Sequence, residues 1–254
     1  EPILCELVRA LRDPSSVAGL VGREGDGLVK NADALKPPDL DVLPFPPRKH
    51  PFDDYLGIPI TNILSSRGCT RNCSFCSIAA WHRLCGGDRL RLRAPEHLAD
   101  EMALLYGQGV RIFNFHDDNF VLDDKVAMLE RMHALRSALA ARNVTAPIAF
   151  AIKCRPDVVD AEVFELLREM GMFRVFLGLE AGTAESLRRL GRGQTVEDNL
   201  RALEILGGLE IHTCFNLLVL NPDSTLEDLA GNVAFLRAHP FFFNDTATTE
   251  IYTG

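Results

Sequence analysis

Apolar runs and helical stripes alternate along the chain from Ile58 onward. Short runs of consecutive apolar residues predict buried strands, and the segments between them carry apolar residues at helical spacing. Strands that are apolar at consecutive positions are typical of a parallel sheet whose faces are covered. The predicted strands are IPITNIL (58–64), VRIFNF (110–115), PIAFAI (147–152), FRVFLGL (173–179) and HTCFNLLVL (212–220).

Each predicted helix begins at a residue suited to a helix start. Pro95 suits a first helical position, Asp123 and Asp160 are fitting N-caps, and Thr195 and Thr225 are each followed three residues later by Asp. After Asp123 the predicted apolar stripe is Val126, Leu129, Met132, Leu135 and Leu139. The order predicts an α/β fold, a partial (β/α) barrel that stops after about five β-α units.

Polar side chains follow every predicted strand. A barrel of this kind carries its active site at the carboxyl ends of its strands, where these residues would meet. Their convergence indicates an enzyme. The segments are 67–76, 116–119, 153–157, Glu180 and 221–223.

The two ends of the chain differ from the middle. Residues 1–57 are rich in Gly and Pro; GLVGREGDGLVKN (19–31) predicts a hairpin, and the proline-rich stretch 36–51 predicts an extended connector without regular structure. We expect residues 1–57 to be the tail of a preceding domain with its linker, and 58–240 to be the barrel. NDTATTEIYT (244–253) resembles a translated sequencing adapter, so 241–254 are expected to be a non-native tail.

Composition narrows the class of protein. The net charge of −8 argues against a nucleic-acid partner, which favours a basic face. No apolar run reaches the roughly 18 residues that span a bilayer, and no signal-peptide pattern opens the chain. The seven cysteines are odd in number, and three lie close together. This usage is typical of a metal or catalytic role in a reducing compartment, so we predict a cytoplasmic protein.

The clustered cysteines lie in RGCTRNCSFC (67–76), with the spacing C-x-x-x-C-x-x-C. Three thiolates are one fewer than a closed tetrahedral zinc site needs, and His82 or Cys85 is the available fourth ligand. With Cys85 the set would also suit a four-cysteine iron–sulfur electron carrier. A third option is a [4Fe–4S] cluster on three thiolates, which leaves one iron open.

The residues Cys69, Cys73, Phe75 and Cys76, on a loop after the first barrel strand, resemble the signature of the radical S-adenosylmethionine (SAM) superfamily. The resemblance implies that the three cysteines hold a [4Fe–4S] cluster whose open iron binds SAM. It also implies one-electron cleavage of SAM to a 5′-deoxyadenosyl radical, which abstracts hydrogen from a small-molecule substrate. The electron donor would be a flavodoxin or a ferredoxin.

The same resemblance suggests cofactor-binding residues outside the cysteine loop. Phe75 would lie beside the adenine, and Asp117 and Asp118, in a D-D-N-F version of the second-strand motif, would face the SAM amino group. Glu180, in GLEAG, would reach the ribose and amino-acid part. Arg155 would face the SAM carboxylate or the substrate, with an ion pair to Asp157 as the alternative. GRGQTVED (191–198) looks structural, with Gly191 and Gly193 marking a turn.

The N-terminal segment resembles the end of a cobalamin-binding domain and its linker in cobalamin-dependent radical enzymes. That resemblance implies cobalamin in a longer parent protein and methyl transfer to an unreactive centre, or else ring formation or rearrangement. Two alternatives stay open: a methylthiotransferase-like radical enzyme acting on tRNA, and the four-cysteine electron carrier.

Overall fold

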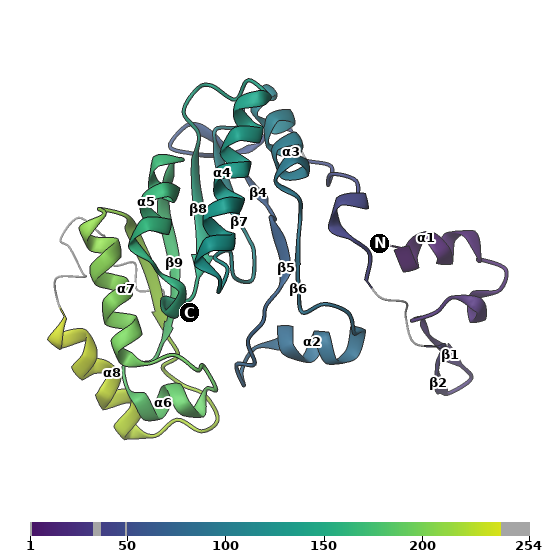
Figure 1. Ribbon diagram of the computed structural model, residues 1–254. Coiled ribbons are helices and arrows are strands. Elements are labelled where there is room, and N and C mark those ends of the chain that lie inside the picture. The colour runs from purple at the N-terminus through teal and green to yellow at the C-terminus, as the bar shows by residue number, and fades with distance from the viewer. Residues whose placement is uncertain (1, 33–36, 49, 240–254) are drawn as a thin grey trace.

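The computed structural model describes residues 2–32, 37–48 and 50–239, so the predicted tail 241–254 lies outside it. Its centre is a six-stranded sheet in the order β10-β9-β8-β7-β4-β3 (Figure 1). Five strands are parallel, and β3 at one edge pairs antiparallel with β4. The strands are β3 (Asp53–Tyr55), β4 (Ile58–Ile63), β7 (Ile112–Phe115), β8 (Ala149–Cys154), β9 (Met172–Glu180) and β10 (His212–Leu217).

The five predicted β-α units are confirmed, and their helices gather on the outer side of the sheet (Figure 1). Phe113 on β7, Phe164 on α5 and Leu177 on β9 are completely buried in the one large apolar core between sheet and helices. Side chains alternate between the two faces of a strand, so the other face of each strand stays open to the concave side. The helices are α3 (Pro95–Gly107), α4 (Lys125–Ala141), α5 (Ala161–Glu169), α6 (Ala184–Arg189), α7 (Val196–Gly208) and α8 (Leu226–Ala238).

The sheet curls far enough to bring distant strands together across its concave side. Tyr55 on edge strand β3 accepts a hydrogen bond from Arg174 on β9 at 3.1 Å, and its ring centroid lies 6.4 Å from that of Phe173. Three strands separate β3 from β9 in the sheet order. The contact therefore closes the amino-terminal end of a half-barrel, as the predicted fold class requires.

Helix α4 corrects one detail of the prediction. Its N-cap is Asp124 rather than Asp123, and the Asp124 carboxylate accepts hydrogen bonds from the backbone N–H groups of Val126 and Ala127. Val126, placed in the predicted stripe, is 63% exposed. The rest of the predicted stripe is confirmed: Leu129 packs against the core, and Met132, Leu135 and Leu139 are buried. The buried residues are Met128, Met132, Leu135, Ala138 and Leu139.

The N-terminal segment is more structured than a connector. The predicted hairpin is confirmed as β1 (Val21–Glu24) and β2 (Gly27–Lys30), which follow helix α1 (Pro2–Arg9). The described residues of the proline-rich stretch, 37–48 and 50–51, include a 3₁₀ turn, Leu40–Val42. The Asp41 carboxylate accepts a hydrogen bond from the Ala94 N–H at the start of α3. Strand β3 also belongs to this segment. The prediction that 36–51 lacks regular structure was therefore wrong at Leu40–Val42, while the domain division at residue 57 stays a prediction.

Arginine side chains cover the edge of the sheet beyond β3. Because β3 pairs only with the first half of β4, the later residues of β4 have no neighbouring strand on that side. Arg48 donates to the Asn62 carbonyl at 3.0 Å, and Arg93 donates to the Leu64 carbonyl at 2.8 Å. Glu101 of α3, only 2% exposed, accepts from Arg48 at 2.7 Å and from Arg93 at 2.5 Å. These contacts block further strand pairing at this edge.

We predict that Glu101→Ala lowers the free energy of unfolding by about 3–5 kcal/mol, because it leaves two neighbouring guanidinium groups without their shared carboxylate. The measurement is urea unfolding followed by circular dichroism. Glu169→Ala is the matched control, since the Glu169–Arg136 pair is exposed and its loss is expected to cost about 1 kcal/mol or less. Equal losses in the two variants would contradict a structural role for Glu101.

Candidate functional site

The cysteine loop spans the open end of the half-barrel. It follows β5 (Ser66–Gly68), which pairs antiparallel with β6 (Leu90–Leu92), and leads into α2 (Ser77–Cys85). At the far side Ser74 donates from its N–H to the Leu190 carbonyl at 2.9 Å and from its hydroxyl to the Arg189 carbonyl at 3.3 Å. The loop thus runs from the β4 side of the sheet to the connection after β9, over the carboxyl ends of the strands.

Asp117 fastens the start of this loop to the end of β7. Its side chain is completely buried, and its carboxylate accepts from the Ser65 N–H at 3.1 Å, the Ser65 hydroxyl at 2.7 Å and the Ser66 hydroxyl at 2.5 Å. Burial raises the pKa of Asp117, and the serine hydrogen bonds oppose that rise. These contacts assign Asp117 to holding the loop; its predicted contact with a cofactor amino group stays a prediction.

Asp118 lies in a different setting from its neighbour. It is exposed, and one of its oxygens accepts from the Gly68 N–H at 3.0 Å, directly before Cys69. Gly68 has a φ of 97°, and a Cβ there would lie 2.0 Å from the Arg89 carbonyl oxygen, so only glycine fits. Of the two predicted aspartates, Asp118 is the one with an accessible carboxylate beside the cysteine loop.

Two guanidinium groups converge on the middle cysteine of the loop. Cys73 is buried, and its sulfur lies 3.4 Å from Nη1 of Arg192 and 3.7 Å from Nη1 of Arg155. Cys69 and Cys76 are partly exposed; burial raises the pKa of the Cys69 thiol, and nearby Arg155 counteracts this. Neighbouring cations favour the thiolate form, which is the form that binds metal.

Arg155 makes the ion pair that was the alternative considered for it, while its contact with a SAM carboxylate or substrate stays a prediction. Its Nε and Nη2 donate to the two oxygens of Asp157 at 2.8 and 3.0 Å, so the alternative ion pair is present. The remaining nitrogen faces Cys73, and Nη2 also donates to the Arg192 carbonyl at 2.6 Å. Its guanidinium is therefore oriented toward the cysteine loop, not toward open solvent.

Glu180 ends β9 in an unusual backbone conformation. Its φ is 64°, a left-handed value that costs a residue with a side chain on the order of 1 kcal/mol. The carboxylate is nearly buried, and one oxygen lies 3.8 Å from Nη2 of Arg192. Burial raises the pKa of Glu180, and Arg192 and Arg155 pull it down. Phe75, 45% exposed, has its ring centroid 6.0 Å from the Arg192 guanidinium carbon.

Arg192 was missing from the predicted site. The prediction of a turn is confirmed, since Gly191 and Gly193 have φ values of 61° and 65°. The residue between them is nevertheless only 6% exposed and contacts Cys73, the Gly178 carbonyl and Glu180. A long cationic side chain between two glycines, in the connection between α6 and α7, was the available signal.

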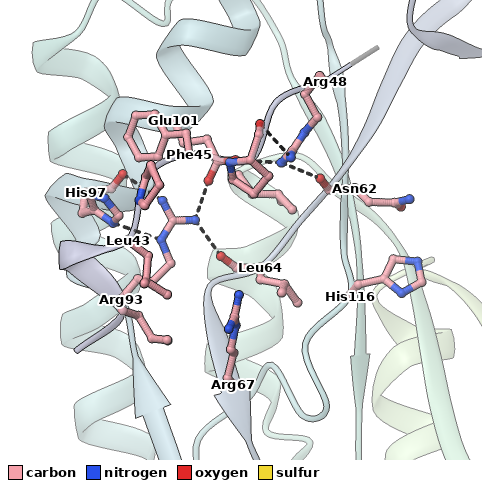
Figure 2. Close-up of a pocket in the computed structure, with 14 residues that line it drawn as sticks. Leu43, Phe45, Arg48, Asn62, Leu64, Arg67, Arg93, His97, Glu101 and His116 are labelled. Atoms are coloured by element: carbon pink, nitrogen blue, oxygen red, sulfur yellow. Dashed lines mark hydrogen bonds and ion pairs between the residues drawn. The ribbon is translucent and has the colours of Figure 1, made fainter. Parts of the chain in front are cut away.

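Two adjoining cavities lie beside the loop. Figure 2 shows one of about 380 Å³ between the linker, α3 and β4, with Arg93 bridging Glu101 and Leu64. The other, of about 460 Å³, is lined by α2 and by β5 beside the cysteine loop. His116 borders both cavities and contacts Nζ of Lys153 at 3.2 Å; burial and Lys153 lower the pKa of His116. Leu64 and Arg67 also line both.

The side chains that could bind a metal bear on the zinc and iron–sulfur interpretations drawn from the sequence. Within the described residues no three His, Cys, Asp or Glu side chains lie close enough to hold one metal ion, so the zinc interpretation gains no support. The side chain of Cys85, the alternative fourth ligand, lies outside the described part. Three cysteines on one loop, with cations at the buried sulfur, fit a larger anionic group bound through thiolates. A cubane cluster spaces its thiolates farther apart than a single ion does.

Cys154 is outside this group. It is buried on the core face of β8, and burial raises the pKa of its thiol, as expected for a packing residue. No helix in the described part of the chain is long and apolar enough to cross a membrane.

The chain belongs to the Radical SAM superfamily, whose family model matches residues 63–236. It is 27% identical over 244 residues to the uncharacterized methyltransferase PH0819 of Pyrococcus horikoshii, covering 91% of this chain and 50% of that protein. It is 29% identical over 230 residues to the hopanoid C-3 methylase of Methylococcus capsulatus, covering 87% and 41%. The chain thus spans half or less of these curated relatives.

Solved structures show the same fold. The radical SAM methyltransferase TsrM of Kitasatospora setae superposes with a TM-score of 0.70 at 24% identity, covering 94% of this chain and 48% of that one. The cobalamin-dependent radical SAM enzyme OxsB superposes with a TM-score of 0.69 at 20% identity, covering 92% and 34%. At these identities the likeness concerns the fold. With the family match, the radical SAM recognition and the enzyme class are confirmed.

We predict that the two neighbouring aspartates respond differently to substitution. Asp117→Ala leaves a buried N–H and two serine hydroxyls without their acceptor, which is expected to lower the free energy of unfolding by about 2–3 kcal/mol or more. Asp118→Ala is expected to change it by about 0.5 kcal/mol, as is usual for an exposed side chain. Urea unfolding midpoints check both values. A stable Asp117→Ala protein would contradict the loop-holding role.

Proposed function

We propose that this protein is a radical SAM enzyme in which Cys69, Cys73 and Cys76 hold a [4Fe–4S] cluster that supports reductive cleavage of SAM. When bound, the cluster supplies one electron to the sulfonium of SAM and so yields a 5′-deoxyadenosyl radical. The observation that carries the proposal is the cysteine loop itself. It lies across the open end of the half-barrel, with its buried sulfur against two guanidinium groups.

The residues around the loop have distinct tasks in this proposal. The Asp118 carboxylate, accessible beside Cys69, binds the ammonium of SAM, because a carboxylate and an ammonium form a charge-assisted hydrogen bond. Glu180, directed inward by its left-handed backbone, accepts from hydroxyl groups of the ribose. Phe75 offers its exposed ring to the adenine. Arg155, fixed by Asp157, presents its cation to the carboxylate end.

Methyl transfer to a small-molecule substrate is the reaction that the relatives favour. Beside the two methyltransferase relatives, the chain is 27% identical over 165 residues to the cytidylyl-2-hydroxyethylphosphonate methyltransferase of Streptomyces wedmorensis. Cobalamin in a longer parent protein is part of this proposal, because the segment before the barrel resembles the end of a cobalamin-binding domain. The two cavities that His116 borders are the place for the substrate. A reduced flavodoxin or ferredoxin supplies the electron.

Ring formation is the second candidate. The chain is 27% identical over 238 residues to the anaerobic magnesium-protoporphyrin IX monomethyl ester cyclase of Rubrivivax gelatinosus, covering 90% of this chain. Both candidates share the same first step, so that step is the one to test.

We predict that anaerobic protein reconstituted with iron and sulfide, then given dithionite and SAM, forms 5′-deoxyadenosine. Cys73→Ala removes the buried ligand and is expected to reduce this product to the level without protein. Chromatography with mass detection measures the product. Cys5→Ala is the matched control, because Cys5 is exposed on α1 and distant in sequence from the loop.

A fully loaded cluster that forms no 5′-deoxyadenosine in the wild type would instead favour the electron carrier. In that case Cys85→Ala should cost the protein its iron. In the radical enzyme, Cys85→Ala retains it.

A further inference from the structure

Arg192 has a buried cation whose contacts are not explained by binding SAM. Its Nη1 lies 3.4 Å from the Cys73 sulfur, and its Nη2 donates to the Gly178 carbonyl at 2.6 Å. The Glu180 oxygen, at 3.8 Å, is a looser contact than either. The Nε of Arg192 is buried without a hydrogen-bond partner.

The charges around Cys73 are unequally compensated. Arg155 donates two short hydrogen bonds to the Asp157 carboxylate. The negative charge of Asp157 therefore offsets most of the field that Arg155 exerts at the sulfur. Arg192 has no comparable carboxylate within the described structure, only the carbonyl and the distant edge of Glu180. A guanidinium in a dry site interacts strongly with nearby anions, because neither water nor salt screens it. Arg192 is therefore the stronger electrostatic influence on the sulfur.

Glycines around Arg192 leave space for its contact with Cys73. A Cβ on Gly178 would lie 3.0 Å from Nη2 of Arg192 and 2.9 Å from the Glu180 oxygen. Gly191 and Gly193, both with positive φ, direct the chain so that Arg192 points inward. The close approach of arginine to sulfur thus depends on several residues beside the loop.

We propose that Arg192 sets the reduction potential of the cluster by donating a charged hydrogen bond to the Cys73 sulfur. This inference rests on the proposed function, since it takes Cys73 as a cluster ligand. When an external reductant such as dithionite gives the cluster one electron, the cluster gains one negative charge and no proton is transferred. A buried cation at a ligand sulfur stabilises that added charge, and hydrogen bonds to sulfur are known to tune such potentials. Arg192 thereby makes the cluster easier to reduce.

The test is a potentiometric titration of the reconstituted protein without SAM, following the reduced cluster by electron paramagnetic resonance. In Arg192→Met the ratio of reduced to oxidised cluster at a fixed potential is expected to fall about tenfold, which corresponds to about 59 mV for one electron. Arg192→Lys keeps the charge but loses the planar fork, so its ratio should lie between those of Arg192→Met and the wild type. Gly178→Ala, which crowds the guanidinium, should also lower the ratio.

Arg188→Met is the matched control. Arg188 lies four residues earlier in the chain, is largely exposed, and pairs with Glu185 on its own helix, so its loss should leave the potential unchanged. An unchanged potential in a fully loaded Arg192→Met protein would overturn the proposal. If Arg192→Met loads too little iron to titrate, Arg192→Gln takes its place: a lower potential supports the proposal, and the wild-type value overturns it.

The outcome is separable from that of the proposed function. A wild-type protein that makes no 5′-deoxyadenosine but shows the potential shift on Arg192→Met refutes SAM cleavage and leaves the role of Arg192 standing. Formation of 5′-deoxyadenosine with no shift in potential on Arg192→Met supports SAM cleavage and refutes the role of Arg192.

Discussion

The arrangement of the site depends on the convergence of Arg155 and Arg192 at the sulfur of Cys73. Arg155 directly follows β8, and Arg192 lies in the connection between α6 and α7. Cys73 belongs to the loop that crosses the opening of the half-barrel. Arg155 also donates to the Arg192 carbonyl, so the two are joined to each other. Burying two cations near each other is costly unless anions compensate them. Asp157, Glu180 and a Cys73 thiolate supply that compensation.

Asp117 and Glu101 serve the same loop from its other side. Asp117 secures the serines that precede the cysteines, and Glu101 organises the arginines that cover the edge of β4. The start of the loop is thus held by a buried carboxylate, and its far end by hydrogen bonds from Ser74. This leaves Cys69, Cys76 and Phe75 partly exposed, as a loop that must receive a cofactor requires.

Sequence reasoning predicted the order of elements well because local chemistry specifies it. Thr195 and Thr225 form capping boxes with Asp198 and Asp228, as their spacing indicated. It failed at Val126 of α4, which is exposed, and in the proline-rich stretch, where Leu40–Val42 form a 3₁₀ turn and Leu40 is only 3% exposed. A proline-rich segment still buries its apolar side chains when a neighbouring surface is available.

The sequence by itself determined the cysteine spacing, the alternation of strands and helices, and the family to which the chain belongs. These are local or periodic properties of the chain, so they can be recognised without knowing any tertiary contact. Only the tertiary structure separated Asp117 from Asp118, because adjacent residues at a strand end face opposite ways. It alone brought Arg192 to Cys73, 119 positions apart in the chain, because that contact exists only once the sheet has curled and the loop has crossed its open end.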